Sequence, residues 1–216
     1  MRFEWLFIGY VFMFQITVGN ITLLPFLAYL IMLFAMLRLS RFENAFKKAK
    51  YALFAAVPIG GALLALQIFK TVSPESASAA AFTYTYNTVR ILSECAEMVI
   101  MFFVYVGVKI IGTNTELKSL EKHAGRNMAV MFVYFAFEMT MSLISIFAPK
   151  LIEGYEIIML YPFIVGFIWR VLNLWMIITC YLGVSVKDPN AAAVEETKAV
   201  KTQFPQKKKN KKHRRH

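Results

Sequence analysis

The sequence has few of the residues on which catalytic and metal sites usually depend. Its 216 residues include one aspartate, Asp188, and three histidines, His123, His213 and His216. An aspartyl protease that cuts within the membrane needs two aspartates to share a proton, and a metal-dependent headgroup transferase needs several as ligands. The histidines lie in basic segments without zinc-site spacing. The sequence thus carries no catalytic signature, and we expect no cofactor and no metal site.

Cysteine and charge are also scarce. The two cysteines, Cys95 and Cys180, lie in apolar stretches without the spacing of a metal site or a disulfide framework, so we interpret them as small buried residues. Only 17% of residues are charged, whereas 58% are hydrophobic. A soluble domain is usually about 45–50% apolar. The excess lies in blocks long enough to cross a bilayer, which indicates a multi-pass membrane protein.

Six apolar blocks predict an all-α transmembrane bundle of six helices, at about residues 3–18, 25–39, 51–69, 88–111, 128–148 and 157–186. The first block is short for a full span, so five spans are expected instead if it is interfacial or re-entrant. It runs on without a signal-peptide cleavage site, which favours a retained membrane segment. The basic segment 38–50 either extends the second helix along the headgroups or forms a loop. Residues 115–123 fit a short surface helix.

Lysine and arginine are distributed unevenly between the blocks. Segments 38–50, 109–127 and 187–216 are rich in them, whereas 70–88 and 149–156 are nearly free of them. By the positive-inside rule the first set lies in the cytoplasm and the second outside. This predicts a plasma-membrane protein with a cytoplasmic C-terminus.

The last 30 residues, 187–216, form a polybasic tail that we expect to be disordered. Each cation near an anionic lipid surface contributes about 1 kcal/mol of attraction. Anionic headgroups are therefore the expected contact, and nucleic acid is not, because Phe204 is the tail's only aromatic residue. The expected lipid-contacting cations are Lys207, Lys208, Lys209, Lys211, Lys212, Arg214 and Arg215.

Ionisable residues inside the apolar blocks are the candidate functional site. Arg90, Glu94 and Glu97 have the i, i+4, i+7 spacing of one helical face. Arg90 and Glu94 are expected to pair locally, which leaves Glu97 deeper and less compensated. A charge at bilayer depth is costly unless it has a partner or a wet cavity.

The fifth and sixth blocks carry further polar residues. Glu138 lies near the middle of one block and Arg170 near the middle of the other, with Asn173 on the face of Arg170. Counting from the predicted helix ends gives Glu138 and Arg170 similar depths, at which an ion pair is more plausible than two isolated charges. Two interpretations stay open: a polar pathway or pocket between the last three helices, or a salt-bridge network that fixes their packing.

A family resemblance involves two short stretches. Residues 25–30, PFLAYL, followed by residues 44–49, NAFKKA, resemble the opening of small, uncharacterised multi-pass bacterial membrane proteins. In that family an acidic residue often follows the proline, whereas Phe26 stands here. The resemblance implies a polytopic fold and brings no activity and no site residues.

Function therefore stays open between classes. The first hypothesis is a membrane protein that handles a small solute, ion or lipid through the polar face of the last three helices. The second is a non-catalytic assembly or sensory subunit whose intramembrane charges bind a partner helix or a second copy. The third is a membrane enzyme that acts on lipid.

The charge pattern predicts the orientation of two loop positions. In a background without native cysteines, Ser78→Cys should react with a membrane-impermeant thiol reagent added outside intact cells. His123→Cys should react only after the membrane is opened, because it lies in a basic segment. The reverse labelling pattern would overturn the orientation.

Overall fold

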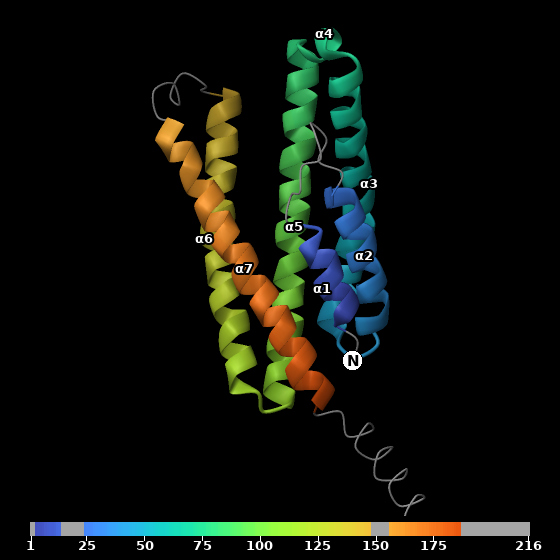
Figure 1. The fold of residues 1–216 in the computed structure, drawn as a ribbon, viewed down its shortest axis with the longest axis vertical. Coiled ribbons are helices and arrows are strands. Elements are labelled where there is room, and N and C mark those ends of the chain that lie inside the picture. The colour runs from blue at the N-terminus through green and yellow to red at the C-terminus, as the bar shows by residue number, and fades with distance from the viewer. Residues whose placement is uncertain (1–2, 14–23, 148–155, 187–216) are drawn as a thin grey trace, which may run out of the picture.

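The chain is described here by a computed structural model that covers residues 3–13, 24–147 and 156–186 and is helical with no strand in these ranges (Figure 1). The helices are α1 (Glu4–Val11), α2 (Leu24–Leu39), α3 (Asn44–Val72), α4 (Pro74–Ala77), α5 (Ala80–Asn114), α6 (Lys118–Phe147) and α7 (Glu156–Val186).

Four helices, α3, α5, α6 and α7, contain segments long and apolar enough to cross a membrane. α2 contributes a shorter apolar segment, Phe26–Leu39, and α1 has only 8 residues. Length and composition thus make this a helical membrane protein. Part of the first predicted span, residues 14–18, and the whole polybasic tail, residues 187–216, lie outside the described residues.

Several helices begin earlier than the apolar blocks predict. Of the basic segment 38–50, Arg38 and Leu39 end α2, whereas residues 44–50 form neither a loop nor an extension of that helix. They are the first turns of α3, where Ala45, Phe46 and Ala49 are buried at helical spacing. The Glu43 side chain accepts a hydrogen bond from the Asn44 amide at this helix start.

The expected surface helix at 115–123 merges with the fifth block into α6. Leu120, Ala124 and Asn127 are buried on one face, so packing holds the basic first turns of α6 in the helix. α5 likewise begins at Ala80 rather than near Thr88. The apolar blocks are shorter than these helices because the basic and polar helix ends are too polar to lie in lipid, whereas a helix can continue as a helix beyond the bilayer.

Six helices form a closed ring in which each packs against two neighbours, in the order α1, α2, α3, α5, α6, α7 and back to α1. Buried side chains cross this ring. The ring of Phe3, just before α1, meets that of Phe46 in α3 edge to face at 6.3 Å between centroids. The Tyr29 hydroxyl in α2 donates a hydrogen bond to the Ser93 carbonyl in α5 at 3.1 Å. Because α1 packs against α7, the first and last of the described helices are neighbours in space.

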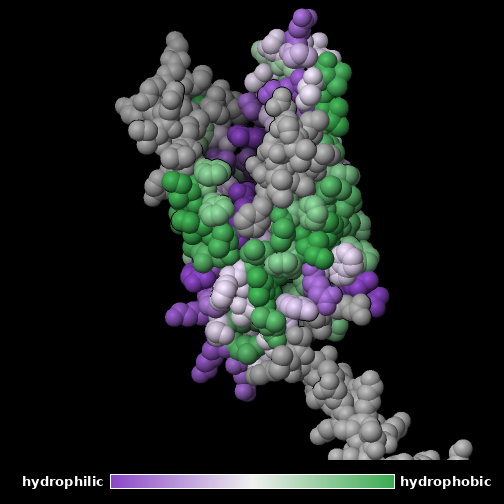
Figure 2. Space-filling view, viewed as in Figure 1, coloured by the Kyte–Doolittle hydropathy of each residue, from purple (hydrophilic) through white to green (hydrophobic). Residues whose placement is uncertain are grey.

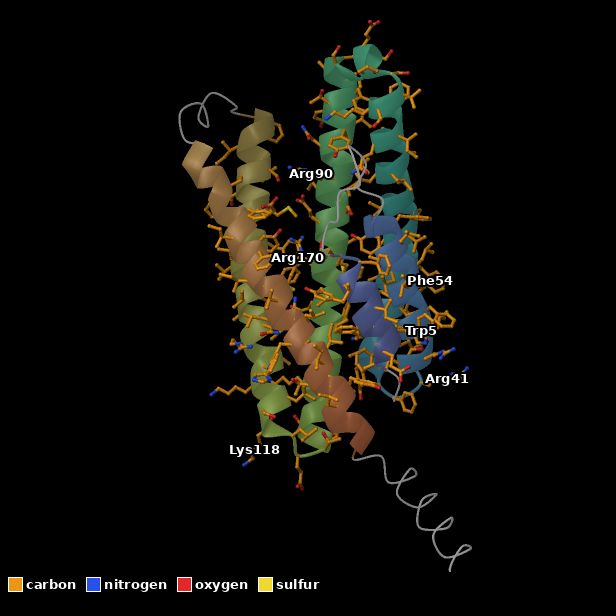
Figure 3. The ribbon with its side chains drawn as sticks, in the orientation of Figure 1. Trp5, Arg41, Phe54, Arg90, Lys118 and Arg170 are labelled. Atoms are coloured by element: carbon orange, nitrogen blue, oxygen red, sulfur yellow. The ribbon has the colours of Figure 1, made fainter. Side chains whose placement is uncertain are left out.

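The two ends of the bundle differ. Figure 1 places the start of α1, the α2–α3 and α5–α6 turns and the end of α7 at one end, and α4 at the other. Arg41 and Lys118 lie at the first of these ends (Figure 3). We call it the basic end, because segments 38–50 and 109–127 meet there. Between the ends, large apolar side chains such as Phe54, Val133 and Phe163 are more than half exposed. Figure 2 shows hydrophobic side chains, in green, over much of this middle region. This surface fits the acyl chains of a bilayer.

α1 reaches its place in the ring because Gly9 lets two backbones approach. A Cβ atom at Gly9 would lie 2.8 Å from Met32 Cγ and 3.0 Å from the Met32 backbone nitrogen. Gly125 in α6 is the opposite case, with no atom within 4 Å of such a Cβ. The two glycines are therefore a matched pair for measuring how firmly α1 is packed.

We expect Gly9→Ala to destabilise the protein and Gly125→Ala to be neutral or stabilising. Alanine gains up to about 1 kcal/mol of helix propensity over glycine at either site. At Gly9 overpacking opposes this gain with a cost of about 1–3 kcal/mol. Thermal unfolding of the detergent-purified protein measures both variants. Equal stability of the two variants would show that α1 is not held against α2.

Candidate functional site

The polar face of α5 turns toward α6 in the half of the bundle away from the basic end. Arg90 Nη2 donates a hydrogen bond to Ser142 Oγ in α6 at 3.0 Å. Arg90 Nε lies 3.7 Å from Glu94 Oε1, which makes the local ion pair expected from their spacing. Arg90 is partly exposed, whereas Glu94 is more shielded. This pair therefore lies at the more exposed end of the charged face of α5.

Arg170 extends from α7 into the space between α5 and the α6–α7 pair, as Figure 3 shows. Among the charged groups around it, the Glu97 carboxylate of α5 attracts the guanidinium most strongly. Tyr134 of α6 is a hydrogen-bonding neighbour of Arg170. Two helices, α5 and α6, thus each supply one group around this partly buried cation of α7. Arg170 faces the interior rather than lipid.

The structure does not form the Glu138–Arg170 pair that the predicted helix ends suggest. Asn127 contacts Asn173 at 3.2 Å, and the Tyr134 ring packs against Gly166, so Arg170 is level with about residue 130 of α6. Glu138 then lies about two turns away along α6, roughly 12 Å at 1.5 Å per residue. The predicted depths agreed because the fifth helix was expected to begin at residue 128, whereas α6 begins at Lys118, so Glu138 lies nearer to the end of its helix than the prediction has it.

Glu138 nevertheless belongs to the same group of charges. Its carboxylate repels those of Glu94 and Glu97, and no described Lys or Arg forms an ion pair with it within 4.0 Å. The cluster therefore holds three carboxylates and two guanidinium groups. We call Arg90, Glu94, Glu97, Glu138 and Arg170 the charged cluster.

Several polar atoms of the charged cluster are shielded yet make no hydrogen bond within the described residues. They are Glu94 Oε2, Glu97 Oε1, Arg90 Nε and Arg170 Nε. An unsatisfied buried polar group costs about 1–3 kcal/mol, and a charged one more. A network built only to fasten helices would pair these atoms with each other. This arrangement instead presents both acceptors and donors toward the space between the helices.

A second, uncharged cluster lies on the basic-end side of Arg170. Asn173, which is fully buried, accepts from the Tyr105 hydroxyl at 2.6 Å and donates to the Tyr10 hydroxyl at 2.7 Å. Trp169 Nε1 donates to the Tyr105 hydroxyl at 2.8 Å. Asn127 donates to the Leu172 carbonyl at 2.9 Å. This neutral cluster connects α1, α5, α6 and α7. Its hydrogen bonds fill the interior of the ring between the charged cluster and the basic end.

Figure 2 shows how hydrophilic side chains are distributed over one face of the molecule. In the half of the molecule away from the basic end, hydrophilic side chains line a hollow between the α6–α7 pair and the α3–α5 pair. The charged cluster belongs to helices that border this hollow, and Arg90 and Arg170 both lie between α5 and the α6–α7 pair in Figure 3. Next to the hollow, hydrophobic side chains cover the middle of this face, and hydrophilic side chains appear again at the basic end. We call the hollow the polar cleft.

Sequence reasoning missed most of the neutral cluster. Asn127 was assigned to a loop, although Ala124, Asn127, Met131 and Tyr134 recur at helical spacing and are all buried. That spacing was the signal available. Tyr10 carries no such signal in the sequence, because its hydrogen-bond partner Asn173 lies 163 positions away.

Comparison with known proteins yields no assignment, since no family model, no curated protein and no solved structure matches the chain. The resemblance of residues 25–49 to small bacterial membrane proteins therefore stays a prediction. Within the described ranges no three His, Cys, Asp or Glu side chains are grouped closely enough to hold a metal ion.

The neutral cluster predicts a specific pattern of stability loss. Asn173→Leu should cost about 1–3 kcal/mol, because the Tyr105 and Tyr10 hydroxyls lose a buried partner. Asn114→Leu, at the exposed end of α5, should cost little. Adding Tyr105→Phe to Asn173→Leu should cost less than the sum of the two single changes, since paired apolar replacement leaves fewer groups unsatisfied. Thermal unfolding of the purified variants tests this, and strict additivity would contradict the network.

Proposed function

We propose that the chain is a multi-pass protein of the plasma membrane that binds a small solute, ion or lipid group in the polar cleft between α5, α6 and α7. In this proposal α1 and α2 complete a six-helix bundle. The basic end and the tail face the cytoplasm, where the tail cations contact anionic headgroups. The cleft then opens toward the outside.

The observation that carries the proposal is the set of shielded, unpartnered atoms in the charged cluster. Glu97 Oε1 and Arg170 Nε carry opposite charge on facing helices, yet neither has a hydrogen-bond partner among the described residues. Ionised groups at bilayer depth are tolerated when they line a wet cavity or hold a ligand. A cleft open to water at one end and closed by the neutral cluster at the other meets that condition.

The position of the neutral cluster supports a binding site rather than an open channel. Asn173, Tyr105 and Trp169 are each at most 1% exposed, so this part of the ring has no room for a continuous water path. A solute that enters from the charged side would stop there. Passage across the bilayer would require these hydrogen bonds to open, as in transporters that expose a central site to one side at a time.

The proposal predicts that the charged face is wet and the outer face is not. In a background without native cysteines, Glu97→Cys should react with the small membrane-impermeant reagent MTSET added outside intact cells. Val133→Cys, at a similar depth on α6 but 67% exposed on the outer surface, should not react because lipid surrounds it. Labelling is read by mass shift after purification.

Two results would count against a wet cleft. If Glu97→Cys reacts only after solubilisation, the charges form a closed packing network. If it reacts only from the cytoplasmic side, the cleft opens toward the basic end and the assigned orientation is wrong. A dry interior combined with loss of a co-purifying membrane protein in Glu138→Gln would favour the assembly or sensory function instead.

A further inference from the structure

The charges of the cluster do not balance. Arg90 forms an ion pair with Glu94, and Arg170 is attracted chiefly to Glu97. Neither Glu97 nor Glu138 has a cation within 4.0 Å among the described residues, and Glu138 repels both other carboxylates. With every group ionised, the cluster therefore carries one negative charge in excess. In a region bordered by lipid this excess favours a bound monovalent cation.

The unpartnered oxygens indicate what kind of cation fits. Glu94 Oε2 and Glu97 Oε1 belong to residues one helical turn apart on α5, and both are shielded acceptors without a donor. The two unpartnered donor nitrogens belong to the arginines that already face these carboxylates. What the cluster lacks is therefore mainly N–H or O–H donors that point in more than one direction. An ammonium group supplies three donors and one positive charge.

A bare metal ion fits less well. Calcium and magnesium draw several oxygen ligands to within about 2.0–2.6 Å of one point. In the part of the chain that the structure describes, no three acidic, histidine or cysteine side chains converge in that way. Hydrogen bonds from an ammonium group reach acceptors one at a time, at about 2.7–3.2 Å, and tolerate a wider spacing.

We infer that the ligand of the polar cleft carries one ammonium group, held by the carboxylates of Glu94 and Glu97, with Glu138 supplying the balancing negative charge. This inference rests on the proposed function, because it requires that the cleft be open to solutes. Arg90, at the more exposed position, then lies toward the entrance. Arg170 attracts Glu97 from the closed end.

The test uses the full-length protein in nanodiscs of phosphatidylcholine, which carry no net charge. The probe is n-butylammonium chloride, and binding is measured by isothermal calorimetry and by the shift in thermal unfolding. Sodium chloride at equal ionic strength, tetramethylammonium chloride and sodium butyrate are the comparison solutes. Tetramethylammonium has the charge without N–H donors, and butyrate has the opposite charge.

We expect saturable binding and a raised unfolding temperature with n-butylammonium, weaker effects with tetramethylammonium, and none with butyrate. Glu97→Gln should weaken n-butylammonium binding about tenfold or more, through the loss of a charge-assisted hydrogen bond. Glu75→Gln, on the exposed helix α4, is the control and should bind as the unchanged protein does.

A second variant covers the case in which Glu97→Gln fails to fold. Glu138→Gln removes a carboxylate that repels its neighbours, so it should fold at least as well, yet it should also bind n-butylammonium more weakly. Equal binding by Glu138→Gln and the unchanged protein would overturn the inference. The inference would also be overturned if butyrate or tetramethylammonium bound as tightly as n-butylammonium. The same holds if lowering the pH, with no amine present, raised the unfolding temperature as n-butylammonium does.

The two proposals fail in different ways. If Glu97→Cys reacts with MTSET from outside but n-butylammonium does not bind, the cleft is open and only the ligand class is wrong. If Glu97→Cys does not react and no probe binds, the proposed function and the ligand class are both wrong.

Discussion

The fold depends on the cost of placing ionised side chains within an apolar slab. Arg90, Glu94 and Glu97 occupy one face of α5, and that face can avoid lipid only if other helices cover it. α6 and α7 cover it, and Arg170 brings a cation toward Glu97 from the opposite side. The remaining helices complete the ring and present apolar side chains outward. The charged cluster therefore determines which way α5, α6 and α7 face.

The ring contains two kinds of polar chemistry, which are separated along its axis. Towards the basic end, Asn173 and Tyr105 form short neutral hydrogen bonds in a fully buried setting. On the other side of Arg170, ionised groups line a hollow and keep atoms without partners. Neutral groups can be satisfied by fixed partners in a dry interior, whereas ionised ones need water or a ligand. This division matches the closed half and the open half of the bundle.

Much of the architecture was predictable from the sequence, because runs of apolar residues identify membrane helices directly. The all-helical fold, the bounds of α2 and the local Arg90–Glu94 pair follow from pattern and spacing. The partner of Arg170 did not follow, because pairing between helices depends on their register. Counting from apolar boundaries put Glu138 beside Arg170, whereas the helices begin in polar residues such as Asn44 and Lys118. Contacts such as that of Tyr10 with Asn173 leave no trace in local sequence.

The closure of the ring between α1 and α7 has a consequence for biogenesis. The Tyr10 hydroxyl meets Asn173 only after almost the whole chain has been synthesised. Until then α1 lacks one neighbour, and Glu97 is synthesised well before Arg170, the cation that it attracts. The nascent protein must therefore protonate or hydrate this carboxylate during insertion. Assembly of the bundle is completed by α7, so chains that stop before it leave the ring open between α6 and α1.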